Sequence, residues 1–290
     1  MKTAKTIYLI AIIFITVVVV AFFGGRKIKA FRGLFTDVDV VKDSATLEPF
    51  KEIELDANAV NFTVVDGEDY HVDYEYPSYM TLKGDVDHET LKIELKGKQK
   101  DSFGFLRLDK GGLHTVEPKI TVTVPEGSEL AKMYLKINAG NVTLSKRIIE
   151  ELDVDCDAGN FNINEITSNK VKVLTEAGNI EIDDSTLGDC EFGTSAGRIS
   201  VDETVMNNVA VETNMGEINF DGTTFAKGEA ESNMGSVKID GNFEELKCNT
   251  NMGEISVDSE SIDNAKLDLS VDLGEVKVNG NSKGSSFVQK

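Results

Sequence analysis

A column of aspartates is the one set of residues in this sequence whose types and spacing could bind a ligand. Five positions after successive glycines stand Asp183, Asp202, Asp221, Asp240 and Asp258. Several carboxylate oxygens along one edge are the ligands that Ca²⁺ prefers, so the column predicts a calcium-binding edge. A structural alternative is that aspartate suits the turn after a strand, because its side chain bonds the following backbone. The sequence lacks the glycine-rich nonapeptide of calcium-loaded β-rolls.

Cysteine, histidine and methionine give weaker indications of chemistry. The three cysteines and three histidines lack zinc or haem spacing, and so few cysteines argue against a disulfide framework. We expect the cysteines in the core and the histidines on the surface; they are Cys156, Cys190, Cys248, His71, His88 and His114. Met215, Met234 and Met252 each precede a glycine, and we expect them to fill the core. The sequence therefore predicts no catalytic residue and no cofactor other than calcium.

The elements that must position the aspartates form a repeat of about 19 residues. A small–glycine step recurs at Gly140, Gly159, Gly178, Gly197, Gly216, Gly235, Gly253 and Gly274, at spacings of 19, 19, 19, 19, 19, 18 and 21. Apolar residues stand two and four positions after each glycine, and mostly three and five before it. Period two on both sides of a glycine predicts two short strands that meet at a bend. One such unit cannot bury its apolar face alone, but stacked copies can.

The repeat predicts an all-β chain, with a parallel β-helix or β-solenoid of about eight rungs over residues 131–279. A third apolar position, eight or nine residues after the glycine, is expected to close the third side at Ile148, Val205, Phe225, Phe243 and Ile262. Residues 50–130 alternate less regularly and predict an N-terminal β region that caps the first edge. Residues 280–290 predict a flexible tail. A β-sandwich is the competing fold, although its strands do not usually keep so regular a spacing.

The N-terminal residues predict a membrane anchor. We expect a short tail at 1–6, a transmembrane helix at 7–25 and a basic juxtamembrane linker at 26–49, because Ile7 to Phe23 is almost wholly apolar. Bulky Phe22 and Phe23 stand where a cleaved signal peptide would have small residues. Two lysines precede the span and four cations follow it, which favours a cytoplasmic C-terminal side. Long domains often cross regardless of flanking charge, so orientation stays open.

The charge of the chain excludes one class of partner. Lys and Arg number 30 and Asp and Glu 50, a net charge of −20, and such a field repels nucleic-acid phosphates. From residue 131 onward the chain has 14 basic and 29 acidic residues. A polysaccharide lyase would need cations to stabilise its enolate, so the composition weakens the enzyme hypothesis.

Several segments carry a resemblance to a known family: residues 60–67 (Val-Asn-Phe-Thr-Val-Val-Asp-Gly), 91–95 and 120–127, and the Ala-Gly-Asn-Val and Met-Gly-Glu-Ile steps of the repeat. In these segments the sequence resembles a bacterial putative-adhesin family of β-strand-repeat proteins of unknown function. The resemblance implies a short inner tail, one membrane span and an outer β domain linked to surface adhesion or envelope-stress modules. It brings no catalytic or binding residues with it.

Three hypotheses of function follow. The first is a membrane-anchored, extracellular and non-catalytic module that binds a cell-surface protein or glycan, or acts as an envelope scaffold. The second is a cytoplasmic polymer resembling bactofilin, in which bare solenoid ends stack head to tail. The third is a β-helix enzyme that acts on polysaccharides. Oligomeric state and ligand identity remain open.

Overall fold

The computed structural model describes residues 39–97, 102–103, 106–109, 112–115 and 117–290. The predicted tail at 1–6, the predicted anchor at 7–25 and residues 26–38 of the predicted linker lie outside the described residues. Among the helices that are described, none has the length and apolarity to cross a membrane.

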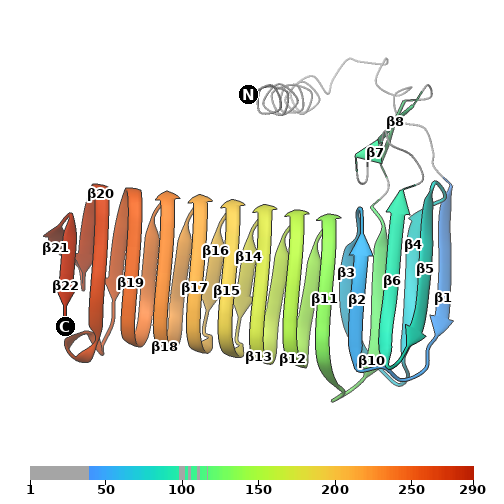
Figure 1. Ribbon diagram of the computed structural model, residues 1–290, viewed down its shortest axis with the longest axis horizontal. Coiled ribbons are helices and arrows are strands. Elements are labelled where there is room, and N and C mark those ends of the chain that lie inside the picture. Colours follow the sequence, from blue (N-terminus) through green and yellow to red (C-terminus); the bar gives the residue numbers. More distant parts are fainter. Residues whose placement is uncertain (1–38, 98–101, 104–105, 110–111, 116) are drawn as a thin grey trace, which may run out of the picture.

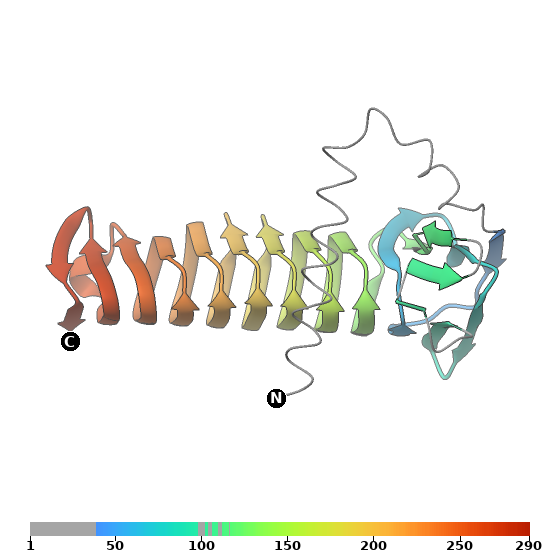
Figure 2. The same cartoon turned by 90° about the horizontal axis from the view of Figure 1, so that it is seen from above.

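The described chain is almost entirely β-structure, arranged as one row of rungs (Figure 1). The rungs are built from β11 (Glu129–Ala139), β12 (Val142–Ala158), β13 (Phe161–Ala177), β14 (Ile180–Asp183), β15 (Thr186–Ala196), β16 (Ile199–Asp202), β17 (Val205–Met215), β18 (Ile218–Met234), β19 (Val237–Asp258) and β20 (Lys266–Val278). Each repeat contributes a short and a long stretch of strand, and neighbouring repeats pair in parallel (Figure 2). The predicted β-solenoid of about eight rungs is confirmed.

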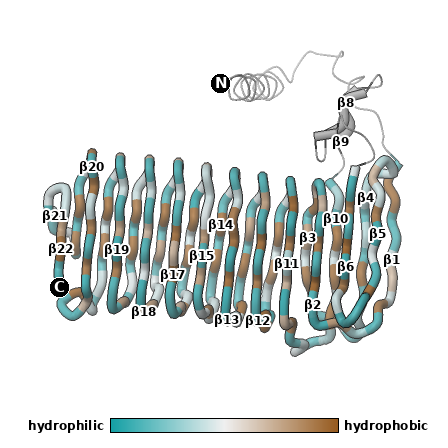
Figure 3. The backbone as a smooth tube through the Cα atoms, in the orientation of Figure 1, coloured by the Kyte–Doolittle hydropathy of each residue, from teal (hydrophilic) through white to brown (hydrophobic). Residues whose placement is uncertain are grey.

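The solenoid is held together by columns of equivalent apolar residues. Ile180 lies beside Ile199, and Ile199 beside Ile218, in successive rungs, and all three side chains are fully buried. Hydrophobic and hydrophilic residues alternate along the strands of the rungs (Figure 3). Since each fully buried aliphatic side chain contributes about 1.5–3 kcal/mol, the alternation directs one face of each strand into a shared core.

The glycine corner stacks by direct contact between backbones. The Gly178 N–H donates to the Ala196 carbonyl at 3.0 Å, in the next rung. A Cβ on Gly178 would lie only 1.7 Å from the Gly159 carbonyl oxygen in the preceding rung. The corner therefore requires glycine because no side chain fits between neighbouring rungs.

A second corner lies six residues after each of the first five glycines of the repeat, where the structural alternative for the aspartates had expected a turn after the strand. Four non-glycine residues there have left-handed backbone angles, with φ of 46–55°; they are Lys146, Glu165, Asp184 and Glu203. Hydroxyl groups on the inner side satisfy this bend: Ser185 donates to the Asp183 carbonyl, and Thr204 to that of Asp202, both at 2.8 Å. Ser185 Oγ also accepts from the Ile166 N–H at 3.1 Å.

The third apolar position was partly misplaced. Ile148 and Val205, eight residues after the glycine, are 45% and 50% exposed, whereas Ile149 and Met206 directly after them are buried. Phe225 and Phe243 are buried as expected and their rings stack at 5.3 Å. The second corner shifts the inward parity by one residue, which explains the error.

The N-terminal region closes the first end of the solenoid. It consists of β1 (Val40–Thr46), β2 (Glu52–Ala57), β3 (Asn61–Gly67), β4 (His71–Pro77), β5 (Met80–Asp87), β6 (Thr90–Gly97) and β10 (Lys119–Pro125). Strands β2 and β3 pair in parallel with β11 and β12, while β1, β4 and β5 pair antiparallel and end the two sides. A separate small sheet comprises β7 (Ser102–Phe103), β8 (Leu106–Asp109) and β9 (Gly112–Thr115). Residues 40–46, expected within the linker, thus form a strand.

The C-terminal end also differs from expectation. In place of a flexible tail at 280–290, β21 (Asn281–Gly284) and β22 (Ser286–Gln289) pair antiparallel with β20. The Gln289 side chain donates to the carbonyls of Ile262 and Ala265, at 2.6 and 2.9 Å, beside the short 3-10 helix η2 (Ile262–Asn264). The exposed edge of the last rung gives these residues partners that their composition alone does not reveal.

Candidate functional site

The structure brings the predicted aspartates together as a ladder at the second corner. Asp183 pairs in register with Asp202, and Asp202 with Asp221. The register shifts between Phe220 and Thr223, beside Asp240. Asp258 ends β19, where the preceding Val257 pairs with β20. The column therefore forms, most regularly over its first three members.

The ladder concentrates negative charge at its first rungs. Burial raises the pKa of Asp183 above its usual value, and the nearby carboxylates of Asp202, Glu181 and Asp184 raise it further. The Ser200 hydroxyl donates to Asp202 Oδ2 at 3.4 Å. Like charges on adjacent strands destabilise a sheet, so these carboxylates weaken the rungs that carry them.

Metal binding at the ladder stays a prediction. Within the described part of the chain, no group of three or more His, Cys, Asp or Glu side chains is arranged to hold a metal ion. A melting series with and without millimolar calcium tests the predicted edge. An increase in melting temperature that Asp183→Asn/Asp202→Asn abolishes would support it, and an unchanged wild-type value would reject it.

The cysteines are core residues, as predicted. Cys156, Cys190 and Cys248 are buried free thiols. Burial raises the pKa of Cys156 to about 11 and that of Cys190 to about 12, and it raises the pKa of Cys248 as well. Because the thiolate is the reactive form, these environments make the thiols poor nucleophiles. His88 is exposed and His71 lies partly exposed beside Asp73, with 3.4 Å between His71 Nε2 and Asp73 Oδ1.

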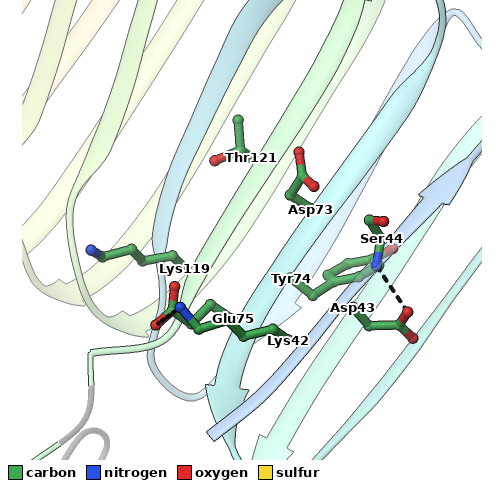
Figure 4. A pocket seen from close by; sticks show the side chains of 8 residues that line it. All are labelled: Lys42, Asp43, Ser44, Asp73, Tyr74, Glu75, Lys119 and Thr121. Carbon is green, nitrogen blue, oxygen red and sulfur yellow. Dashed lines mark hydrogen bonds and ion pairs between the residues drawn. The ribbon is translucent and has the colours of Figure 1, made fainter.

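A polar hollow of about 390 Å³ lies on the outer side of the N-terminal region (Figure 4). Three neighbouring strands, β1, β4 and β10, place its side chains in two rows. One row is Lys42, Glu75 and Lys119; the other is Ser44, Asp73 and Thr121. Lys42 Nζ lies 3.1 Å from Glu75 Oε1.

The chemistry of this hollow suits a polar ligand. Its two rows offer ammonium and hydroxyl donors beside carboxylate acceptors, the groups that recognise sugars and peptides. Tyr74 lies beneath it in the core, where burial and Asp43 raise the pKa of its phenol to about 12. The buried ring is therefore not a stacking platform for a ligand. No feature of the sequence had identified this hollow, because its residues come from separate, irregular strands.

The methionines contradict the prediction that they fill the core. Met215, Met234 and Met252 are 53%, 44% and 45% exposed. They stack in register, and Leu273, 68% exposed, continues the column in the last rung. The residues three and five before each glycine point inward, so strict alternation would place the residue directly before the glycine inside as well. The chain already turns at that residue, and its side chain therefore points outward. We call Met215, Met234, Met252 and Leu273 the methionine stripe.

Together these features define a class: a parallel β-solenoid with both ends closed by antiparallel strands and with open, repetitive columns on its surface. The chain belongs to the Toastrack DUF4097 family, whose model matches residues 50–286. A comparison with curated proteins finds no significant match. The resemblance inferred from the sequence is thereby confirmed.

Solved structures of similar fold carry names that agree with this assignment. A putative adhesin from Parabacteroides merdae has a TM-score of 0.58 at 15% identity, over 84% of this chain and 97% of the other. A putative lipid binding protein from Parabacteroides distasonis has a TM-score of 0.57 at 17% identity, over 85% and 98%. A putative adhesin from the same species reaches 0.53 at 14% identity, over 84% and 98%. At these identities the likeness establishes the fold.

Proposed function

We propose that this protein is a membrane-anchored, extracytoplasmic β-solenoid that acts as a non-catalytic binding or envelope-scaffold module. The observation that carries the proposal is the division of each rung into a closed apolar interior and exposed columns that repeat from rung to rung. Such a rod presents the same chemistry many times along its length, which favours extended or multivalent binding over catalysis at one point. The names of the structural neighbours, two putative adhesins and a putative lipid binding protein, support a binding role.

The placement outside the cytoplasm rests on the sequence and on the family resemblance. A 17-residue apolar run precedes the β domain, and the resemblance implies an outer domain. The flanking charges favour the opposite orientation, so location is the first property to test.

Protease shaving of intact cells that express the chain with a C-terminal tag tests this location. We expect the tag to be lost from intact cells, whereas a cytoplasmic marker protein survives. Retention of the tag in intact cells, with loss only after lysis, would reject the extracytoplasmic placement. A cysteine introduced at exposed Ser282 and labelled with a membrane-impermeant maleimide gives an independent measurement, since the native cysteines are buried.

The bactofilin-like polymer is the less favoured alternative. Head-to-tail stacking needs bare rung edges, and β21 and β22 cover the last rung while β1, β4 and β5 lie at the other end. Electron microscopy of the purified full chain would decide: filaments formed by the unmodified chain would support the polymer instead, and separate rods would reject it. The polysaccharide-active enzyme remains a further alternative, to be tested by product release from cell-wall glycans.

A further inference from the structure

The methionine stripe is an unusual surface for a soluble rod. Four large apolar side chains, between 44% and 68% exposed, occupy the same position in four successive rungs. At about 4.8 Å per rung, the stripe is about 14 Å long. Isolated exposed apolar residues are common, but a contiguous row marks an interaction surface. The same position in the first four rungs holds Ala139, Ala158, Ala177 and Ala196.

The flanks of the stripe are acidic. In the outward positions four and two before, and one and three after, the last four glycines stand six carboxylates and two lysines, all exposed or half-buried, a balance of 2 − 6 = −4. The acids are Glu212, Glu217, Glu231, Glu254, Asp272 and Glu275; the lysines are Lys238 and Lys277. Lys277 pairs with Glu254 at 2.9 Å and with Glu275 at 3.6 Å. Glu212 and Asp272 form no ion pair with any described residue.

We propose that the methionine stripe binds a cationic amphipathic helix of a partner protein. Methionine is flexible and polarisable, and it is used where apolar helix faces of varied shape must be accommodated. An amphipathic helix presents apolar residues once per turn, every 5.4 Å, which nearly matches the rung spacing. Lysine or arginine on both sides of its apolar face would meet the flanking carboxylates, whereas a second copy of this acidic surface or an anionic membrane would be repelled.

The contact is small, so the interaction is weak and transient. Four side chains on a convex corner bury far less than the area typical of a stable complex. The glycine column beside the stripe lets the partner approach the backbone closely, because no side chain projects from it. The inference rests on the proposed binding role, but its test is separate: shaving locates the domain, whereas the peptide assay below measures the stripe.

The test uses the full chain in nanodiscs of zwitterionic lipid, with empty nanodiscs as blank. The probe is a labelled synthetic 18-residue helix with leucine at one-turn intervals and lysine elsewhere, and its control is a scrambled isomer of equal charge. We expect at least tenfold tighter binding of the helix than of the isomer. The variant Met215→Ser/Met234→Ser/Met252→Ser/Leu273→Ser should lose at least tenfold in affinity. The matched control Ile148→Ser/Val205→Ser, which removes exposed apolar residues at the other corner, should stay within twofold.

Methyl-labelled methionine gives a second readout on the unmodified chain. The helix should shift the methyl signals of Met215, Met234 and Met252, and leave those of buried Met80, Met133 and Met206 unchanged. Equal binding of helix and isomer, or full binding by the stripe variant, would show that charge alone acts and would overturn the proposal. Stripe-dependent self-association, or stripe-dependent binding to anionic vesicles without binding of the helix, would assign the stripe to another occupant and equally overturn it.

Discussion

The first four rungs and the last four share one backbone and one core but differ at the glycine corner. In the first four, alanine precedes each glycine, and asparagines on its other side and in the N-terminal region form a ladder that accepts hydrogen bonds from the backbone N–H groups of the next rung. This ladder comprises Asn61, Asn141, Asn160 and Asn179. In the last four, methionine or leucine precedes the glycine, and Asn214, Asn233 and Asn251 bond one another on the other side of it.

The difference separates what the fold requires from what it permits. Both halves need glycine at the corner and apolar residues inside, because every rung touches the next at those points. The outward positions beside the glycine are free to vary, so their change from Ala to Met is not explained by stacking. The comparison attributes stability to the interior and the backbone, and the proposed helix-binding surface lies at the corner.

Replacement of a corner glycine should destabilise the first four and the last four rungs equally, and it should have the largest effect on the free energy of unfolding. A Cβ at Gly178 or Gly235 would lie 1.7 or 1.6 Å from a carbonyl oxygen of the preceding rung. We expect Gly178→Ala and Gly235→Ala each to lower the free energy of unfolding by at least about 3 kcal/mol, measured by urea unfolding. Gly280→Ala is the control, since its left-handed angle imposes strain but nothing lies within 4 Å of its Cβ. A loss at Gly178 no larger than that at Gly280 would contradict the close-stacking account.

An ion pair between a buried arginine and a partly exposed aspartate joins the first rungs to the N-terminal region. Arg147 is buried, and its Nη1 lies 2.5 Å from Asp66 Oδ1, while its Nε and Nη2 have no hydrogen-bond partner among the described residues. Asp66→Asn leaves a buried cation unpaired and should cost about 2–3 kcal/mol. Arg147→Met removes that cation and should cost less, because Asp66 remains partly solvated. Equal losses in urea unfolding of the two variants would show that the pair acts mainly through packing.

The second corner should respond with opposite signs in the two halves. Glu165 has a φ of 53°, whereas Gly222 holds the same place in a later rung with a φ of 62°. Left-handed angles cost a non-glycine residue about 1–2 kcal/mol, so Glu165→Gly should stabilise and Gly222→Ala should destabilise by about 1 kcal/mol each. Thermal unfolding of both variants checks this. The same sign for both would mean that local side-chain contacts, such as Lys146 with Glu165, outweigh backbone strain.

The aspartate ladder should make stability fall as pH rises. Because the folded state raises the pKa of Asp183, it binds more protons than the unfolded state between the usual carboxyl value and the raised one. Stability therefore decreases as pH rises through that window. Asp183→Asn should raise the free energy of unfolding by about 0.2–1 kcal/mol at neutral pH, and it should leave that free energy unchanged at a pH below the window. Unfolding from pH 3 to 7 measures this, with exposed Asp240→Asn as control. An Asp183→Asn gain that persists at pH 3 would have another cause.

How far the sequence predicts this molecule depends on how often a feature repeats. Eight glycines at a spacing of about 19 residues predict the rungs and the core, because stacking demands the same residue at each corner. The left-handed angle of the second corner was missed because the charged residues Lys146, Glu165 and Asp184 adopt it where glycine would have signalled it. The polar hollow was missed because Lys42, Glu75 and Lys119 meet only through pairing of distant strands. The methionines of the stripe were wrongly predicted to be buried, because the inward–outward alternation of a strand does not continue where the chain turns.

The methionine stripe should have the smallest effect on stability per residue replaced, and this small effect sharpens the comparison most. Its side chains are about half exposed, so the serine variant of all four positions should change the free energy of unfolding by less than about 1–2 kcal/mol in total. Phe220→Ala, in the core of the same half, should cost about 3–5 kcal/mol. Urea unfolding of the two variants measures the difference.

A loss of stability in the serine variant comparable to that of Phe220→Ala would mean that the stripe packs the corner, and a structural role would then replace the binding role. Unchanged stability, together with lost helix binding, would leave recognition as the reason these rungs carry methionine.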